Sequence, residues 1–235
     1  GDGTIGEMTD EVFHKGLGSV AERNFRPHVN CVNITPDQKY LCAVDLGVDQ
    51  VKIYRFNYET GKITLVDMLR CEQESAPRII KFSPDGRFAY LICELKNYIS
   101  VYSYKDGPRG PIFELVQTIS TLNEYHAKGS AACVLRFSRD WKYVLCSNAG
   151  DNSIGIFKVD HETGMLEKIC ILPISGDYPK AADFFPDNRH IMSLNHETNT
   201  MTIFKINYEK KYFSLWGKPL KVETPNCILV SEIEG

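Results

Sequence analysis

Apolar residues along this chain either alternate with polar ones or run in stretches of four to eight, and turn residues separate the stretches. The stretches are rich in Val, Ile, Tyr and Phe, which favour the pleated backbone of β-strands. An apolar spacing of three and four residues, which would indicate an amphipathic helix, is absent. The pattern therefore predicts an all-β chain.

One segment type occurs four times, and this repeat predicts the architecture. Its copies start, at spacings of 48, 55 and 47 residues, at Asp49, Asn97, Asn152 and Asn199. A second marker, a Pro-Asp or similar turn, recurs at the same three intervals, counted at Pro36, Pro84, Arg139 and Pro186. Two markers in phase indicate four structural repeats with a period near 48 residues.

The first repeat divides into four predicted strands, at residues 28–34, 40–46, 51–57 and 62–70. Four strands per repeat at this period are typical of a β-propeller blade. We therefore predict a single β-propeller domain over residues 1–235, built from four-stranded antiparallel blades. Complete blades are expected at about 28–74, 77–120, 131–172 and 179–222, with partial blade strands at 1–27 and 225–235. Because a propeller ring must close, the two terminal pieces either share a fifth blade or further blades are missing.

Composition and charge narrow the function classes. The 235 residues are 43% hydrophobic and 24% charged, and they carry a net charge of −3. No segment gathers enough basic residues to follow a phosphate backbone, which argues against nucleic acid as a partner. No apolar run reaches the roughly 18 residues that span a bilayer, and residues 1–11 have neither a basic start nor an apolar core. We therefore expect no membrane partner and a cytoplasmic location.

The cysteines and histidines give no sign of a metal site. The eight cysteines contain no C-x-x-C pair, and most lie inside apolar stretches, as reduced core residues do. None of the six histidines has a second His or Cys at the spacing of zinc ligands. We accordingly predict neither a metal nor a cofactor.

Several stretches make the chain resemble a known family. They are Pro27-His28-Val29-Asn30-Cys31-Val32, Ala43-Val44-Asp45-Leu46-Gly47, Ala76-Pro77-Arg78 ahead of the turn at Pro84, Glu94-Leu95, Gln117-Thr118-Ile119-Ser120-Thr121-Leu122 and Ser147-Asn148. In this order they are similar to the seven-bladed lactonase propellers, which include bacterial 6-phosphogluconolactonase and the fungal carboxymuconate-lactonising enzyme. The resemblance runs from about residue 3 to residue 232. Because family members are usually longer at the N-terminus, it implies a fragment lacking roughly its first two blades rather than a five-bladed ring.

The repeat also aligns residues across the ring, because equal offsets from the turn marker occupy equal places in successive blades. Six residues before the marker lie Asn30, Arg78, Cys133 and Lys180. Ten residues after it lie Leu46, Glu94, Ala149 and His196. The first set opens the innermost strand and the second set ends the next strand. If these strands are antiparallel, both sets meet at one mouth of the central channel.

In the family this mouth is the active site, and the chain departs from the family there. The resemblance implies a histidine where this chain has Asn30, an arginine after Ser147-Asn148 where it has Ala149, and a Pro-Arg motif where it has Lys180. His28 lies two residues before Asn30, on the same face of the predicted strand, and is expected to replace the missing histidine in part.

The resemblance implies functional roles for Arg78 and Glu94, and lactone chemistry explains them. Hydrolysis needs a base that deprotonates water and a donor that holds the oxyanion. We expect Glu94 or His28 to be the base and Arg78 the oxyanion or phosphate partner. The candidate substrate-binding residues are Asn30, Lys180 as a second point charge, His196 and Asn148.

Each of these residues also has a purely structural interpretation. Arg78 and Glu94 would then form only an ion pair between strands. Lys180 would be a solvated surface lysine and His196 a loop histidine. The stretch Asp45-Leu46-Gly47 is interpreted as a turn rather than a site.

Three functions fit the sequence. The first is a lactone hydrolase that opens a small sugar lactone or phospholactone, with 6-phosphogluconolactone the leading substrate by family resemblance. The alternative is a degenerate, non-catalytic propeller that binds a small anion or a protein partner, and the second alternative is a muconate-type cycloisomerase. The presence of Arg78 and Glu94 favours the hydrolase, while the altered positions favour the binding protein. The expected partner is a small-molecule lactone or a sugar phosphate, and the sequence specifies no oligomeric state.

Overall fold

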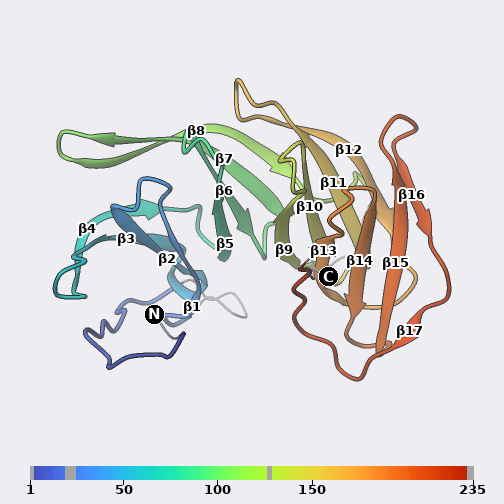
Figure 1. Ribbon diagram of the computed structural model, residues 1–235, viewed down its shortest axis with the longest axis horizontal. Coiled ribbons are helices and arrows are strands. Elements are labelled where there is room, and N and C mark those ends of the chain that lie inside the picture. Colours follow the sequence, from blue (N-terminus) through green and yellow to red (C-terminus); the bar gives the residue numbers. More distant parts are fainter. Residues whose placement is uncertain (1–2, 19–24, 126–128, 232–235) are drawn as a thin grey trace.

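The structure, a computed structural model, describes residues 3–18, 25–125 and 129–231. Within these ranges the chain forms four antiparallel sheets, and its helical structure is limited to the 3-10 turn η1 (Leu46–Val48). The predicted all-β fold of four-stranded propeller blades is therefore confirmed. The sheets follow one another along an arc, with the first strand of each on the inner side and the fourth at the periphery (Figure 1).

Each sheet pairs its strands in sequence order. The first contains β1 (Val29–Ile34), β2 (Tyr40–Asp45), β3 (Gln50–Phe56) and β4 (Ile63–Arg70), and the second contains β5 (Pro77–Phe82), β6 (Phe88–Cys93), β7 (Tyr98–Gly107) and β8 (Gly110–Ser120). The third contains β9 (Ala132–Phe137), β10 (Tyr143–Asn148), β11 (Ser153–Val159) and β12 (Leu166–Pro173). The fourth contains β13 (Pro179–Phe184), β14 (His190–Asn195), β15 (Thr200–Asn207) and β16 (Tyr212–Leu215), and the short β17 (Leu220–Lys221) also pairs with β15.

The turn after the first strand of each sheet accounts for the regularity of the repeat. In three blades a hydroxyl donates to an aspartate two residues later at 2.6–2.7 Å, in the pairs Thr35–Asp37, Ser83–Asp85 and Ser138–Asp140. The second residue after the marker position has a left-handed backbone in all four blades, at Gln38, Gly86, Trp141 and Asn188. Ser, Thr and Asp side chains stabilise such turns locally. In these three blades the turn therefore carries its own stabilising hydrogen bond, formed between residues two apart in the sequence.

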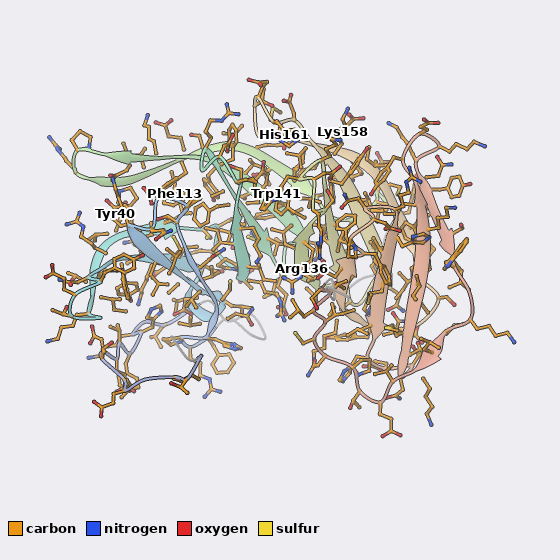
Figure 2. The ribbon with its side chains drawn as sticks, in the orientation of Figure 1. Tyr40, Phe113, Arg136, Trp141, Lys158 and His161 are labelled. Carbon is orange, nitrogen blue, oxygen red and sulfur yellow. The ribbon has the colours of Figure 1, made fainter. Side chains whose placement is uncertain are left out.

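Apolar side chains fill the space between adjacent blades. Three clusters of buried residues join the first blade to the second, the second to the third and the third to the fourth. In the first junction lie Tyr40 and Phe113 (Figure 2), and the Tyr40 hydroxyl donates to Asp106 of the second blade at 2.7 Å. Arg136 and Asp183 form an ion pair of 3.5 Å between the third and fourth blades. The blades are thus joined by side-chain packing and by a backbone hydrogen bond of 3.0 Å from Ala132 N–H to the Glu94 carbonyl, while no strand pairs across a junction in the described residues.

The terminal segments differ from the expected partial strands at 1–27 and 225–235. The structure assigns no strand to the described residues 3–18, 25–28 and 225–231. Residues of the first segment instead contact the first blade: the Thr9 hydroxyl donates to the Gly61 carbonyl at 3.0 Å, and Ile63 N–H donates to Asp10 Oδ2 at 2.9 Å. A strand requires a ladder of backbone hydrogen bonds, and these contacts use side chains.

The cysteines are free thiols, and five of the eight are buried. Burial raises the pKa of Cys93 and of Cys146 to about 12. Among the described residues, no group of His, Cys, Asp and Glu side chains is arranged to hold a metal ion. The same part of the chain contains no helix that is long and apolar enough to cross a membrane.

Gly47 lies where the first blade meets the segment that leads into it. A Cβ at this position would lie 1.6 Å from the Arg26 carbonyl oxygen. We therefore expect Gly47→Ala to lower the free energy of unfolding by about 1–3 kcal/mol, the usual range for overpacking. Urea denaturation followed by circular dichroism measures this change. Gly6→Ala is the control, since no atom lies within 4 Å of a Cβ there, and equal stability of the two variants would contradict the expectation.

Candidate active site

A β-bulge opens the innermost strand of every blade at the same place. The pairing of each first strand with its second slips by one residue, between Val29 and Cys31 in the first blade and between Pro77 and Ile79 in the second. The third and fourth blades repeat the slip. The residues skipped by the register are Asn30, Arg78, Cys133 and Lys180. These are the four residues that the repeat aligned, and a bulge re-aims the side chain that it carries.

The second aligned set follows directly after the second strands. Each of its backbone N–H groups donates to a carbonyl near the start of the first strand of its own blade, at 2.8–3.0 Å. The donor–acceptor pairs are Leu46–His28, Glu94–Ala76, Ala149–Ala131 and His196–Tyr178. Both sets therefore lie at the same end of each blade, as the antiparallel strand order predicts.

Arg78 and Glu94 are in direct contact. Arg78 Nη1 donates to Glu94 Oε2, and Arg78 Nε donates to the Cys133 carbonyl of the third blade at 2.8 Å. The Arg78 carbonyl accepts a hydrogen bond of 3.2 Å from Asn30 Nδ2 of the first blade. Glu94 is fully buried, whereas 21% of the Arg78 side chain is exposed. Three blades therefore meet at Arg78: its guanidinium contacts Glu94 and the third blade, and its backbone carbonyl contacts the first blade.

The third blade contributes apolar residues to this region. Cys133 and Ala149, its two aligned residues, are buried and pack with Ala131 and the partly buried Tyr178. Neither side chain can supply a charged group to a ligand. The cationic and hydrogen-bonding groups at this end of the blades therefore come from the other three blades.

Lys180 and His196 belong to the fourth blade and are both half-buried. His196 Nδ1 lies 3.2 Å from the Pro225 carbonyl oxygen, and its ring centroid is 6.3 Å from that of Tyr178. No ion pair of Lys180 with another described residue is present. Both residues occupy the aligned positions of the fourth blade. The apolar third-blade residues Cys133 and Ala149 therefore separate them from Arg78 in the second blade.

Two other candidates lie outside this arrangement. His28 is exposed and precedes β1, and the bulge at Asn30 interrupts the alternation that would put the two on one face. Asn148 is fully buried, where its Nδ2 donates to the Thr121 carbonyl at 2.8 Å and to the Ser153 hydroxyl at 3.0 Å. The Asn148 side chain is therefore buried and links neighbouring strands through these two hydrogen bonds.

The structure also shows a buried contact that the sequence did not indicate. His14 Nδ1 lies 2.5 Å from Asp45 Oδ2, and His14 Nε2 lies 2.9 Å from the Tyr54 hydroxyl. Asp45 Oδ1 accepts hydrogen bonds from the backbone N–H groups of His28 and Gly47. Asp45 thus forms the turn expected of it and also anchors the N-terminal segment. Thirty-one residues separate His14 from Asp45, so no local spacing signals the contact.

Between the second and third blades, at their turn ends and away from Arg78 and Glu94, lies a partly open pocket of about 260 Å³. Trp141 and His161 are among its lining residues (Figure 2). The pocket contains none of the aligned residues, because those residues lie at the other end of the strands.

Comparison with known proteins gives a consistent assignment. Residues 1–230 match the family described as "Lactonase, 7-bladed beta-propeller". A 6-phosphogluconolactonase from Bacillus subtilis (strain 168) is 27% identical over 227 residues, which are 97% of this chain and 64% of the Bacillus protein. An uncharacterised protein from Lactococcus lactis subsp. cremoris is 33% identical over 228 residues, which are 97% of this chain and 65% of that protein.

Solved structures agree. A putative 6-phosphogluconolactonase from Bacteroides fragilis has a TM-score of 0.81 at 30% identity, covering 93% of this chain and 62% of that one. A periplasmic gluconolactonase from Pseudomonas aeruginosa has a TM-score of 0.82 at 26% identity, covering 91% and 60%. The chain thus spans a little under two thirds of the length of these relatives. Because the family match extends over residues 1–230, the chain belongs to the lactonase family of seven-bladed β-propellers.

Proposed function

We propose that this chain carries the active site of a lactone hydrolase that opens a small sugar lactone by base-assisted attack of water. The observation that supports the proposal most strongly is the contact between the buried Glu94 carboxylate and the partly exposed Arg78 guanidinium at the bulged ends of the strands. The names of the Bacillus, Bacteroides and Pseudomonas relatives point to the same reaction class.

In the proposed reaction Glu94 accepts a proton from the attacking water while Arg78 holds the developing oxyanion. Base catalysis requires the Arg78 guanidinium to turn toward the lactone carbonyl, which uncovers the carboxylate. Arginine has five N–H donors, and two of them are engaged with Glu94 and the Cys133 carbonyl. When the tetrahedral intermediate collapses, the ring C–O bond breaks and the proton passes from Glu94 to the leaving alkoxide. The product is the open-chain hydroxy acid.

In this proposal, Lys180 makes the enzyme prefer a phosphorylated lactone. It is the remaining cation among the aligned residues, and its ammonium group would pair with the phosphate of 6-phosphogluconolactone. Asn30 and His196 would contact the hydroxyl groups of the sugar. For the cellular location we retain the prediction of the cytoplasm.

A second candidate function is the binding of a small anion without turnover. It is favoured by Cys133 and Ala149, which leave the third blade without a polar side chain at either aligned position. Replacing a single oxyanion donor commonly costs about 10²- to 10³-fold in rate, so missing groups in this region weigh against catalysis.

Lactone disappearance tests the proposal. The protein is incubated separately with 6-phosphogluconolactone and with glucono-lactone, and each rate is compared with the spontaneous background. We expect enzyme-dependent opening of the phosphorylated lactone, and we expect Lys180→Ala to reduce its advantage over the unphosphorylated one. Binding of 6-phosphogluconate without any rate above background would favour the anion-binding function instead.

A further inference from the structure

The residue that begins each repeated segment lies directly before the third strand of its blade, in all four blades. We call this position the joint. Asp49, Asn97, Asn152 and Asn199 have a left-handed backbone, with φ between 52° and 54°. The carbonyl oxygen of each accepts a hydrogen bond from the residue after the outer strand; for Asp49 the donor is Cys71 N–H, at 2.9 Å. At each joint the side chain of this Asp or Asn forms hydrogen bonds with the segment that follows the outer strand.

At three of the four joints this residue is asparagine, and its amide group donates. Asn152 Nδ2 donates to Asp177 Oδ1 at 2.8 Å, and Asn152 Oδ1 accepts from Tyr178 N–H at 2.7 Å. Asn97 and Asn199 also donate through Nδ2, in each case to backbone carbonyls. A carboxylate has no hydrogen to donate, so asparagine suits these three joints.

The joint between the first and second blades is different, because the side chain there meets donors. Asp49 Oδ2 accepts from Glu74 N–H at 2.8 Å, and Asp49 Oδ1 accepts from Ala76 N–H at 2.8 Å. The Ser75 hydroxyl approaches the same oxygen at 3.4 Å. An asparagine would turn its NH₂ group toward one of the two N–H donors. This difference explains why the repeat has an aspartate at this joint and asparagine at the others.

The segment that Asp49 holds leads directly to the ion pair. Ala76 is fully buried and has a left-handed φ of 52°, which is uncommon for a residue with a Cβ. Its N–H donates to Asp49, its carbonyl accepts from Glu94 N–H at 2.8 Å, and Pro77 and Arg78 follow it in the chain. A strained backbone persists only where surrounding contacts hold it. Ala76 therefore connects Asp49 to both members of the ion pair.

We propose that Asp49 is a positioning residue that fixes Arg78 relative to Glu94 through the strained backbone of Ala76. Hydrogen bonds to a carboxylate are stronger than those to a neutral amide oxygen, so Asp49 holds this conformation better than asparagine would. Relaxation of Ala76 would move Arg78, and a displacement of 1 Å in an active site can cost about 10²-fold in rate. The expected loss of rate rests on the proposed lactone hydrolase function, whereas the expected displacement of Arg78 does not.

The test compares Asp49→Asn with Asn199→Asp. The two variants make opposite exchanges at equivalent joints, and only the first joint leads to Arg78. We expect Asp49→Asn to lower kcat for lactone opening by about 10- to 100-fold with little change in KM. Asn199→Asp keeps the oxygen that accepts from Thr224 N–H, so its kcat should stay near the wild-type value. Kinetics are measured where urea titration shows that both proteins are fully folded.

A second measurement reports the position of Arg78 without any reaction. In ¹⁵N-labelled protein, the Arg78 Nε–H resonance is assigned by its absence from the Arg78→Lys variant. Its hydrogen bond to the Cys133 carbonyl should protect it from solvent exchange. We expect this protection to be lost in Asp49→Asn and retained in Asn199→Asp. If Asp49→Asn fails to fold, Asp49→Ser, which keeps one acceptor, takes its place with the same expectations.

The outcomes separate the two proposals. Unchanged protection of Arg78 in Asp49→Asn, or an equal loss in Asn199→Asp, would overturn the positioning role, whatever happens to stability. Loss of protection only in Asp49→Asn would support it. If the wild-type protein shows no lactonase activity while that loss is seen, the positioning role stands and the proposed function fails.

Discussion

Glutamine in place of Glu94 is expected to lower kcat for lactone opening by about 10²- to 10⁴-fold, the range that a positioned general base supplies. The amide has nearly the shape of the carboxylate, and its oxygen can still accept a hydrogen bond from Arg78 Nη1. It cannot take a proton from water. Initial rates of lactone disappearance at saturating substrate, corrected for the spontaneous reaction, measure the effect.

Glu114→Gln is the matched control for this substitution. Glu114 also forms an ion pair, with Lys105 at 3.9 Å, but 65% of its side chain is exposed. Its replacement should leave kcat unchanged, because Glu114 lies in β8, the outer strand of its blade, away from the aligned residues. A Glu94→Gln protein with the wild-type kcat would refute the base role of Glu94, and the exposed His28 would become the next candidate.

Arg78→Ala is expected to reduce both stability and activity. Removing the cation from a buried ion pair typically costs about 3–5 kcal/mol, since the remaining carboxylate stays in a dry environment. Here Arg78 is partly exposed, so we expect a loss near the lower end, about 3 kcal/mol in the free energy of unfolding. Loss of the oxyanion donor should lower kcat by about 10²-fold or more. Urea denaturation and lactone kinetics measure the two effects separately.

A double variant identifies the cause of the stability loss. Arg78→Ala combined with Glu94→Gln should recover at least about 1 kcal/mol, because a buried amide is less costly than a buried carboxylate. Lys39→Ala serves as the control, since it breaks the more exposed pair with Asp106 and should cost less than about 1 kcal/mol. A loss in Arg78→Ala no larger than in Lys39→Ala would show that the ion pair is not important for stability.

The blades could be predicted because their signals are local. Asp37, Asp85 and Asp140 each accept a hydrogen bond from a hydroxyl two residues earlier, so the turn is specified within a few residues. The strands between the turns follow from apolar alternation, which depends only on which face is buried. Turn and strand signals recur with one period, and their agreement predicts four antiparallel sheets.

The convergence of the aligned residues was also predictable. Arg78 and Glu94 lie sixteen residues apart, Arg78 near the start of β5 and Glu94 directly after the antiparallel β6, so fixed offsets from the turn bring them to one end of the blade. The prediction for His28 used the same alternation, but it assumed a regular strand. The bulge at Asn30 breaks that regularity, and no residue type in the segment signals a bulge. Asn148 likewise ends its strand as expected, yet its amide donates to the Thr121 carbonyl, which follows the outer strand of the second blade, and to the Ser153 hydroxyl of its own blade.

By itself the sequence determined the number of blades, their turns and the set of residues that share each place in the ring, since all of these follow from short-range periodicity. Only the tertiary structure decided how those residues contact one another. Arg78 donates to the Cys133 carbonyl of the next blade, and His14 contacts Asp45 across 31 residues of sequence. The burial of Glu94 likewise involves the Arg78 side chain that contacts it. The physical reason is that side-chain packing between blades has no period in the sequence: it depends on which neighbour fills the space, and that is fixed only when the blades meet.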